Sequence, residues 1–142
     1  MLAEFRTYLK SLNLAENYYI GKIDNTKLKT IGIYSQSNFR RVESIGKQSS
    51  YDIAGVRILV HWNKNARESE DAARKVFESI RYITGTDMTN SRQVVSNGVT
   101  STETTTVHVD YLDLLDAEPA FIGTDDNGVY EYHISARLYY RR

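Results

Sequence analysis

The sequence predicts an α+β domain in which two helices pack on one face of a mainly antiparallel, mixed β-sheet. Two stretches repeat apolar residues at helical spacing, and several others alternate apolar and polar residues as strands do. Segments rich in Asn, Asp and Gly separate the alternating runs, which is typical of turns between strands. The 142 residues suffice for a single domain over 1–142 but not for two separate cores. The expected order is α-β-β-β-α-β-β-β, with one possible extra hairpin.

The first helix is predicted from residue 1 to about Leu12. Leu2, Phe5, Leu9 and Leu12 recur at the spacing that places them on one face of a helix. Asn13, a residue that disfavours helix interiors, is expected to end it.

Two β-rich runs follow, residues 18–23 and 27–34. The sequence Asp24-Asn25-Thr26 between them favours a turn, so the two runs are expected to form a hairpin. The polar stretch 35–50 shows no period and is expected to be a flexible loop.

Residues 56–62 alternate without interruption and form the clearest central strand. Its apolar face is expected to carry Val56, Ile58, Val60 and Trp62, and its other face Arg57, Leu59 and His61.

The second helix is predicted to begin after Asn65, whose side chain can cap the first turn, with Glu68 three positions later. Glu70 with Arg74 is an i,i+4 pair in the favourable order, as is Asp71 with Lys75. The buried stripe is expected to comprise Ala72, Ala73, Val76, Phe77, Ile80 and Ile83.

The stretch 86–106 is rich in Ser, Thr, Asn and Gly and has only a short apolar centre. We interpret it as a flexible loop, or as a mobile hairpin with its tip near Ser96-Asn97-Gly98. Alternation resumes over 105–111, where Val107, Val109 and Tyr111 are expected on one face.

The chain closes with a strong hairpin signal. Ala120-Phe121-Ile122 precedes the turn-forming run 123–128, and residues 129–140 then alternate through a twelve-residue strand. One face should carry Tyr130, Tyr132, Ile134, Ala136, Leu138 and Tyr140, and the other Glu131, His133, Ser135, Arg137 and Tyr139.

Charge is balanced overall but uneven along the chain. Lys plus Arg and Asp plus Glu both number 18, which argues against a general polyanion binder. Residues 1–50 carry +4, residues 51–100 carry +1 and residues 101–142 carry −5. Either the fold interleaves these segments, or unlike faces of identical subunits meet head to tail, as in rings, and separate as salt rises.

Enzyme and cofactor signatures are missing from the sequence. There is no cysteine, no Gly-x-Ser-x-Gly elbow, and no run of about 20 apolar residues that would span a membrane. His61, His108 and His133 could meet Asp110 or Glu131 at a metal, but as scattered strand histidines they need no such role. The carboxylates Asp110, Asp113, Asp116 and Glu118 fit a solvated edge as well as an acid–base pair. We therefore expect no catalytic, cofactor or metal site.

Tyr and Arg side chains are the best candidates for contacts with other proteins. Tyr139 falls on the polar face of the last strand with Arg137 and Arg141, although it also fits a cross-strand packing pair. The further candidates for contacts with another subunit or another protein are Arg40, Arg41 and Lys47. The arginines could also contact nucleic acid, but without a basic excess we expect no specific binding.

The segment 118–132, EPAFIGTDDNGVYEY, resembles the end of the tail terminator proteins of long-tailed bacteriophages, often labelled minor capsid proteins in phages of Gram-positive hosts. The similarity extends to residues 18–23, 31–34 and 50–60 and to the helix that begins near Glu68. The order and spacing of these pieces carry the resemblance, whereas the stretch 86–106 does not take part in it.

The resemblance implies a structural role in the virion. Such proteins form a ring, typically of six subunits, that caps the head-proximal end of the tail tube, stops tube polymerisation and joins the head-completion or connector protein. It implies no cofactor and no catalytic residue. Localisation would be the virion tail, and the host cytoplasm during assembly.

Two other classes of function remain open on the sequence alone. One is a small intracellular nucleic-acid- or peptide-binding domain that uses the sheet and its arginines. The other is a small hydrolase in which histidines and acids meet in a cleft.

Overall fold

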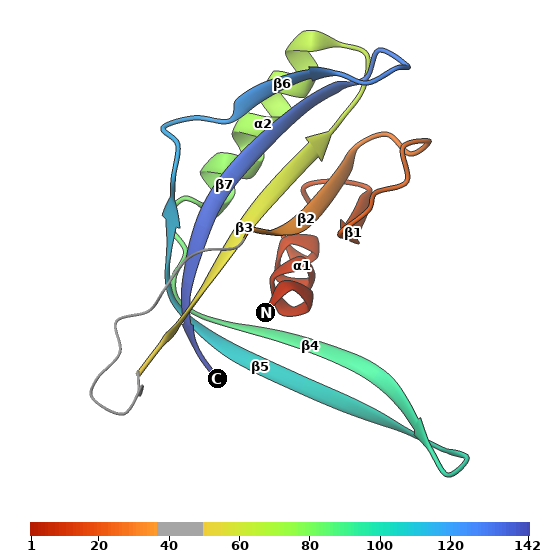
Figure 1. The fold of residues 1–142 in the computed structure, drawn as a ribbon, viewed down its shortest axis with the longest axis vertical. Coiled ribbons are helices and arrows are strands. Elements are labelled where there is room, and N and C mark those ends of the chain that lie inside the picture. The colour runs from red at the N-terminus through yellow and green to blue at the C-terminus, as the bar shows by residue number, and fades with distance from the viewer. Residues whose placement is uncertain (37–49) are drawn as a thin grey trace.

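The computed structural model describes residues 1–36 and 50–142, and within them the chain forms two helices and seven strands (Figure 1). The predicted α+β class is confirmed, and the possible extra hairpin is present, which gives four strands after the second helix. In chain order the elements are α1 (Leu2–Ser11), β1 (Asn17–Ile20), β2 (Thr30–Gln36), β3 (Asp52–His61), α2 (Ala66–Ile80), β4 (Thr84–Ser96), β5 (Val99–Leu114), β6 (Ala120–Thr124) and β7 (Tyr130–Arg141).

The strands form one mixed sheet in the order β1-β2-β3-β7-β5-β4. β6 lies off this path and pairs with the first part of β7, on residues 130–133, while β5 pairs with residues 136–141 of the same strand. All pairings among the described strands are antiparallel except β1 with β2. β7 is therefore the central strand that three others share.

A single hydrophobic core joins both helices to one face of the sheet. Phe5 of α1 and Val76 of α2 belong to the same buried cluster as Ile58 of β3 and Ile134 of β7. The prediction that both helices pack on one face is confirmed. Of the predicted inward residues of β3 and β7, Trp62, Tyr130 and Tyr132 are only half-buried. The others are fully or almost fully buried, and these are Val56, Ile58, Val60, Ile134, Ala136, Leu138 and Tyr140.

The predicted hairpin between the first two strands is wrong, because β1 and β2 run parallel. The connection 21–29 carries the chain back to the starting end of β1, where the Lys29 carbonyl accepts a hydrogen bond from the Glu16 amide at 2.9 Å. Two left-handed backbone positions, Gly21 (φ 75°) and Lys29 (φ 52°), allow the reversals at its ends. On the way the chain buries Ile23 against Gly32, a tertiary contact that the turn-forming residues do not reveal.

Replacing Gly32 by Ala is expected to lower the free energy of unfolding by about 1–3 kcal/mol. A Cβ at position 32 would lie 2.5 Å from Cγ2 of Ile23 and 3.2 Å from Cε2 of Tyr34, and Ile23 is itself buried, so its side chain or the nearby backbone must shift. Urea denaturation measures the change, with Ser35→Ala on the exposed part of β2 as the matched control. Equal midpoints for the two variants would contradict the close packing of Ile23 on β2.

The second helix matches its prediction. The Asn65 side chain caps α2 by accepting a hydrogen bond from the Glu68 amide at 3.1 Å, and the Glu68 carboxylate accepts one from Asn63 Nδ2 at 2.7 Å. The Glu70–Arg74 pair forms at 3.5 Å on the exposed face. Within the described ranges, neither helix is long and apolar enough to cross a membrane.

Of the two structures expected for 86–106, the hairpin is confirmed and the loop is wrong, because the stretch forms most of a regular β4–β5 hairpin. Its tip is at Asn97-Gly98, where both residues have positive φ (51° and 76°), as the Asn-Gly turn predicts. Ser and Thr hydroxyls pair across the strands, at 3.0 Å for Thr89 with Thr106 and 2.9 Å for Ser91 with Thr104. The polar composition therefore reflects exposure, since Thr is a good strand former. The mobility of this hairpin stays a prediction.

The other expected flexible loop, 35–50, is wrong at its first two residues. Ser35 and Gln36 belong to β2 and pair with Val56 and Gly55 of β3. Residues 37–49 lie outside the described residues.

The outer part of the hairpin, residues 91–104, is called the arm below. Figure 1 shows it projecting away from the rest of the fold, and none of its residues is buried. β5 meets β7 only from His108 onward, and no described strand pairs with the outer edge of β4. The arm is thus a two-stranded ribbon with two open edges, a form that is marginally stable alone in water and that invites further pairing.

Helix α1 holds the base of the arm. Thr105 Oγ1 donates a hydrogen bond to Glu4 Oε1 at 2.7 Å, and Thr7 Oγ1 lies 2.9 Å from Asn90 Oδ1. Glu4 is buried and also pairs with the Met1 ammonium at 2.8 Å. These contacts fix where the arm leaves the body, while the arm itself stays outside the core.

Candidate protein-contact surfaces

The predicted contact residues of the last strand lie together on the outer face of the sheet, and tyrosines from two neighbouring strand regions join them. Tyr139 stacks on Tyr111 with 4.4 Å between their ring centroids. The ring centroid of Tyr51 lies 5.9 Å from that of Tyr139. Arg137 lies over the Tyr139 ring at 5.9 Å. We call Tyr51, Tyr111, Tyr139, Arg137 and Arg141 the tyrosine patch.

Carboxylates from β5 hold both arginines of the tyrosine patch. Arg141 pairs with Asp110 at 2.8 Å, and Arg137 pairs with Asp113. The hydrogen bond that Arg137 donates to Asp113 raises the pKa of Arg137. Asp110 and Asp113 contribute to the negative charge of residues 101–142, and both are therefore neutralised by arginines from the same part of the chain.

Tyr111 is in the tyrosine patch because β5 contains a bulge. The register with β7 shifts between Val109 and Tyr111, which turns Tyr111 outward and Leu112 inward, so its predicted place beside Val107 and Val109 is wrong. Burial against the neighbouring rings and a hydrogen bond with Tyr139 raise the pKa of Tyr111. In the sequence, the bulge could have been inferred from the three-residue spacing between the apolar residues Val109 and Leu112, because unbroken alternation gives a spacing of two.

The tyrosine patch borders a shallow pocket of about 440 Å³, lined by Ser50, Tyr51, Asp110, Tyr111, Tyr139 and Arg141. Stacked tyrosines and arginines held in fixed positions are typical of the energetically important centre of a protein interface. The remaining predicted contact residues, Arg40, Arg41 and Lys47, lie outside the described residues.

The three histidines do not meet one another at a metal. His61 was expected on an exposed face but is fully buried, with Nδ1 3.1 Å from Glu131 and Nε2 3.8 Å from Asp125. His108 lies beside a different pair of carboxylates, with Nδ1 2.6 Å from Asp87 and Nε2 3.7 Å from Asp110. Among residues 1–36 and 50–142, no group of three or more His, Asp or Glu side chains has the arrangement of a metal site.

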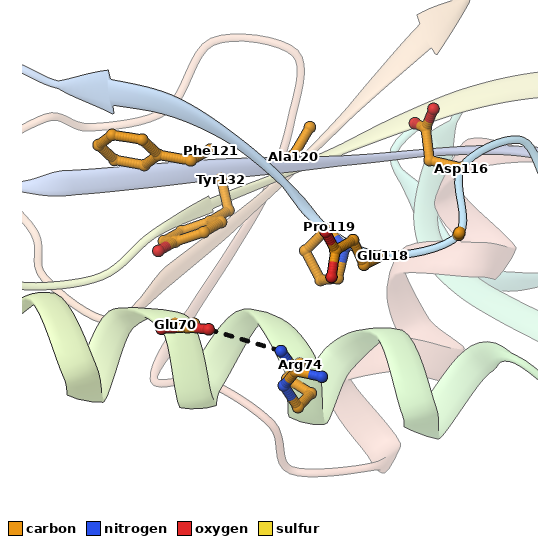
Figure 2. A pocket seen from close by; sticks show the side chains of 9 residues that line it. Glu70, Arg74, Asp116, Glu118, Pro119, Ala120, Phe121 and Tyr132 are labelled. Carbon is orange, nitrogen blue, oxygen red and sulfur yellow. Dashed lines mark hydrogen bonds and ion pairs between the residues drawn. The ribbon is translucent and has the colours of Figure 1, made fainter.

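A second surface lies between β6 and α2. Asp116 and Glu118 line a pocket there of about 590 Å³, and Figure 2 shows Phe121 and Tyr132 beside it and the Glu70–Arg74 pair on the helix below. Phe121 is 55% exposed and packs against Tyr132 in a tilted arrangement, with 5.3 Å between ring centroids. We call this the β6–α2 pocket; it combines an exposed aromatic ring with three carboxylates and one guanidinium.

A sequence model of the family described as bacteriophage tail terminator protein matches residues 8–142. The matched region includes all seven strands, the tyrosine patch and the β6–α2 pocket. No curated protein and no solved structure matches the chain.

Proposed function

Because this chain belongs to the bacteriophage tail terminator family, a family of structural tail proteins, we propose that it assembles into a ring on the head-proximal end of the tail tube. The ring has six copies, the number that the family resemblance implies. It ends tube polymerisation and presents the surface on which the head-completion protein docks. The protein works without catalysis and without a cofactor, in the host cytoplasm during assembly and afterwards in the virion.

The observation that carries this proposal is the family match over residues 8–142. The fold adds two kinds of surface suited to assembly, which are the tyrosine patch and the open-edged arm. Neither surface contributes to the hydrophobic core, because the residues of both lie outside the buried cluster.

Capping follows if the two faces of the ring differ. One face complements the last ring of tube protein, while the opposite face does not reproduce the tube surface, so no further tube subunit can add. A ring built from head-to-tail contacts has this property, because all copies point the same way and the two faces are unlike.

The direct test is polymerisation of the tail tube protein in vitro with and without this chain. Electron microscopy should show tubes that carry a ring at one end and no longer grow when fresh tube protein is added. Tubes that elongate at the same rate in its presence, together with a chain that stays monomeric beside them, would overturn the proposal.

Tyr139→Ala should weaken the contact made by the tyrosine patch by about 2 kcal/mol, or roughly thirty-fold in Kd. The substitution removes the ring that stacks on Tyr111 and packs in a tilted arrangement against Tyr51. Tyr82→Ala is the matched control, because Tyr82 is 75% exposed and has Arg81 over its ring at 5.3 Å, yet lies outside the patch.

Two measurements on these variants separate the partners of the patch. Loss of the ring in sedimentation experiments assigns it to the neighbouring copy, whereas an intact ring that no longer pellets with tubes assigns it to the tube. If Tyr139→Ala behaves like Tyr82→Ala in both measurements, the patch is not a contact surface.

A further inference from the structure

Besides the outer edge of β1, two strand edges lie open at distant places in the described fold. One is the arm, whose strand β4 has no neighbour on its outer side among the described strands. The other is β6, which pairs only with β7 and has no described strand on its other side. Open edges of this length bind other strands readily.

We propose that β4 in the arm of one copy adds to the open edge of β6 in the next copy and fills the β6–α2 pocket. This inference rests on the proposed ring and names the contact that closes it. The chemistry of the two edges, the charges beside them and their separation in the fold each support it.

The β6 edge has the features of a strand-binding site. Phe121 and Ile122 are 55% and 49% exposed on opposite faces of β6, although both are large apolar residues on a short strand. The 590 Å³ pocket beside Phe121 offers space between the strand and α2 for side chains of an added strand. In such complexes backbone hydrogen bonds supply affinity and the pocket supplies specificity.

The arm supplies matching apolar side chains. Val95 and Val99 near its tip are 69% and 66% exposed. From Gln93 to Thr102 there is no charged residue, so this part of the arm can approach an acidic pocket without repulsion. The apolar surface on both partners is then removed from water together.

Charge selects β4 rather than β5 as the added strand. Arg92 of β4 is the single cation of the arm, and its cross-strand partner on β5 is Glu103. In a parallel addition, Val94 opposite Phe121 brings Arg92 opposite Pro119, next to Glu118. The present Arg92–Glu103 pair, at 2.7 Å, is exposed, so exchanging its partner costs little.

The arm of a copy cannot reach its own β6. Figure 1 places the arm tip and β6 at opposite ends of the molecule. The contact therefore joins two copies through unlike surfaces, which is the head-to-tail geometry that closes into a ring or continues as a filament.

Disulfide trapping tests the pairing directly, since the chain has no cysteine of its own. The double variant Val94→Cys with Phe121→Cys should give, on mild oxidation in the presence of tubes, a ladder of covalently linked copies up to the full ring. The matched control combines Val94→Cys with Ile20→Cys, because Ile20 is 40% exposed on β1, the other sheet edge; it should give no ladder.

A second pair of variants guards against accidental cross-linking. Phe121→Lys places a cation beside the expected position of Arg92 and should abolish the ring, while Ile20→Lys should leave it intact. Rings that form without a Val94–Phe121 ladder, or that tolerate Phe121→Lys, overturn this inference alone. A wild-type chain that remains monomeric even on tubes overturns the proposed ring, and this contact with it.

Discussion

Replacing residues 92–103 by the dipeptide Asn-Gly is expected to abolish the ring and the capping of tubes while leaving the fold intact. The deletion joins Ser91 to Thr104, which already pair across the strands, and Asn-Gly forms the tight turn that such a pair requires. No residue of the deleted segment is buried, so the free energy of unfolding should change by less than about 1 kcal/mol.

Sedimentation and tube-growth measurements check this prediction, and thermal unfolding serves as the control for the fold. Amide exchange in the intact chain should agree, with fast exchange over 91–104 in the free protein and slow exchange in the ring. If the shortened chain still forms rings, the arm takes no part in the assembly.

Mixing variants gives a sharper outcome. The shortened chain keeps the β6–α2 pocket and lacks the arm, whereas the Phe121→Lys chain keeps the arm and lacks a working pocket. Neither should assemble alone, but together they can make one arm-to-pocket contact, so the mixture should contain particles of twice the monomer mass and none larger. Larger assemblies, or no association at all, would contradict a head-to-tail contact.

Glu4→Gln is expected to lower the free energy of unfolding by about 3 kcal/mol at neutral pH. Burial alone would raise the pKa of Glu4, but hydrogen bonds from the Met1 ammonium and Thr105 outweigh it and lower the pKa from its ordinary 4.5 to about 2. Because the folded-state pKa is the lower one, the stabilisation is complete above about pH 4.5 and is lost as the pH falls toward 2.

Chemical denaturation at several pH values measures this effect. The difference between wild type and Glu4→Gln should be constant above about pH 5 and shrink steadily below it. Glu16→Gln is the matched control, because Glu16 is 68% exposed and lies 3.9 Å from Lys29, so its effect should stay within about 0.5 kcal/mol. A pH-independent difference for Glu4→Gln would contradict the buried ion pair.

The sequence predicted part of the tyrosine patch. Tyr139, Arg137 and Arg141 were identified because they share one face of a strand whose alternation is unbroken. Tyr51 and Tyr111 were missed because the register of β3 and β5 on β7, and the bulge in β5, bring them to the same place. Neither the register nor the bulge follows from the local pattern of one strand.

The β6–α2 pocket could not be predicted from the sequence, for a similar reason. Asp116 and Glu118 were recognised as a run of like charges, but Glu70 and Tyr132 come from elements far away along the chain. The open edges of β4 and β6 likewise depend on which strands pair, and that is decided by all the strands together.

The sequence by itself determined helix α2 with its Asn65 cap, and the buried faces of β3 and β7. These features are local, because burial on one side of an element leaves a period of 3.6 or 2 residues in the chain. Only the tertiary structure decided that β1 runs parallel to β2, that His61 is buried, and that the Ser/Thr-rich hairpin stands clear of the core. Each of these depends on what packs opposite the segment, and a partner distant in the chain leaves no mark on the local pattern.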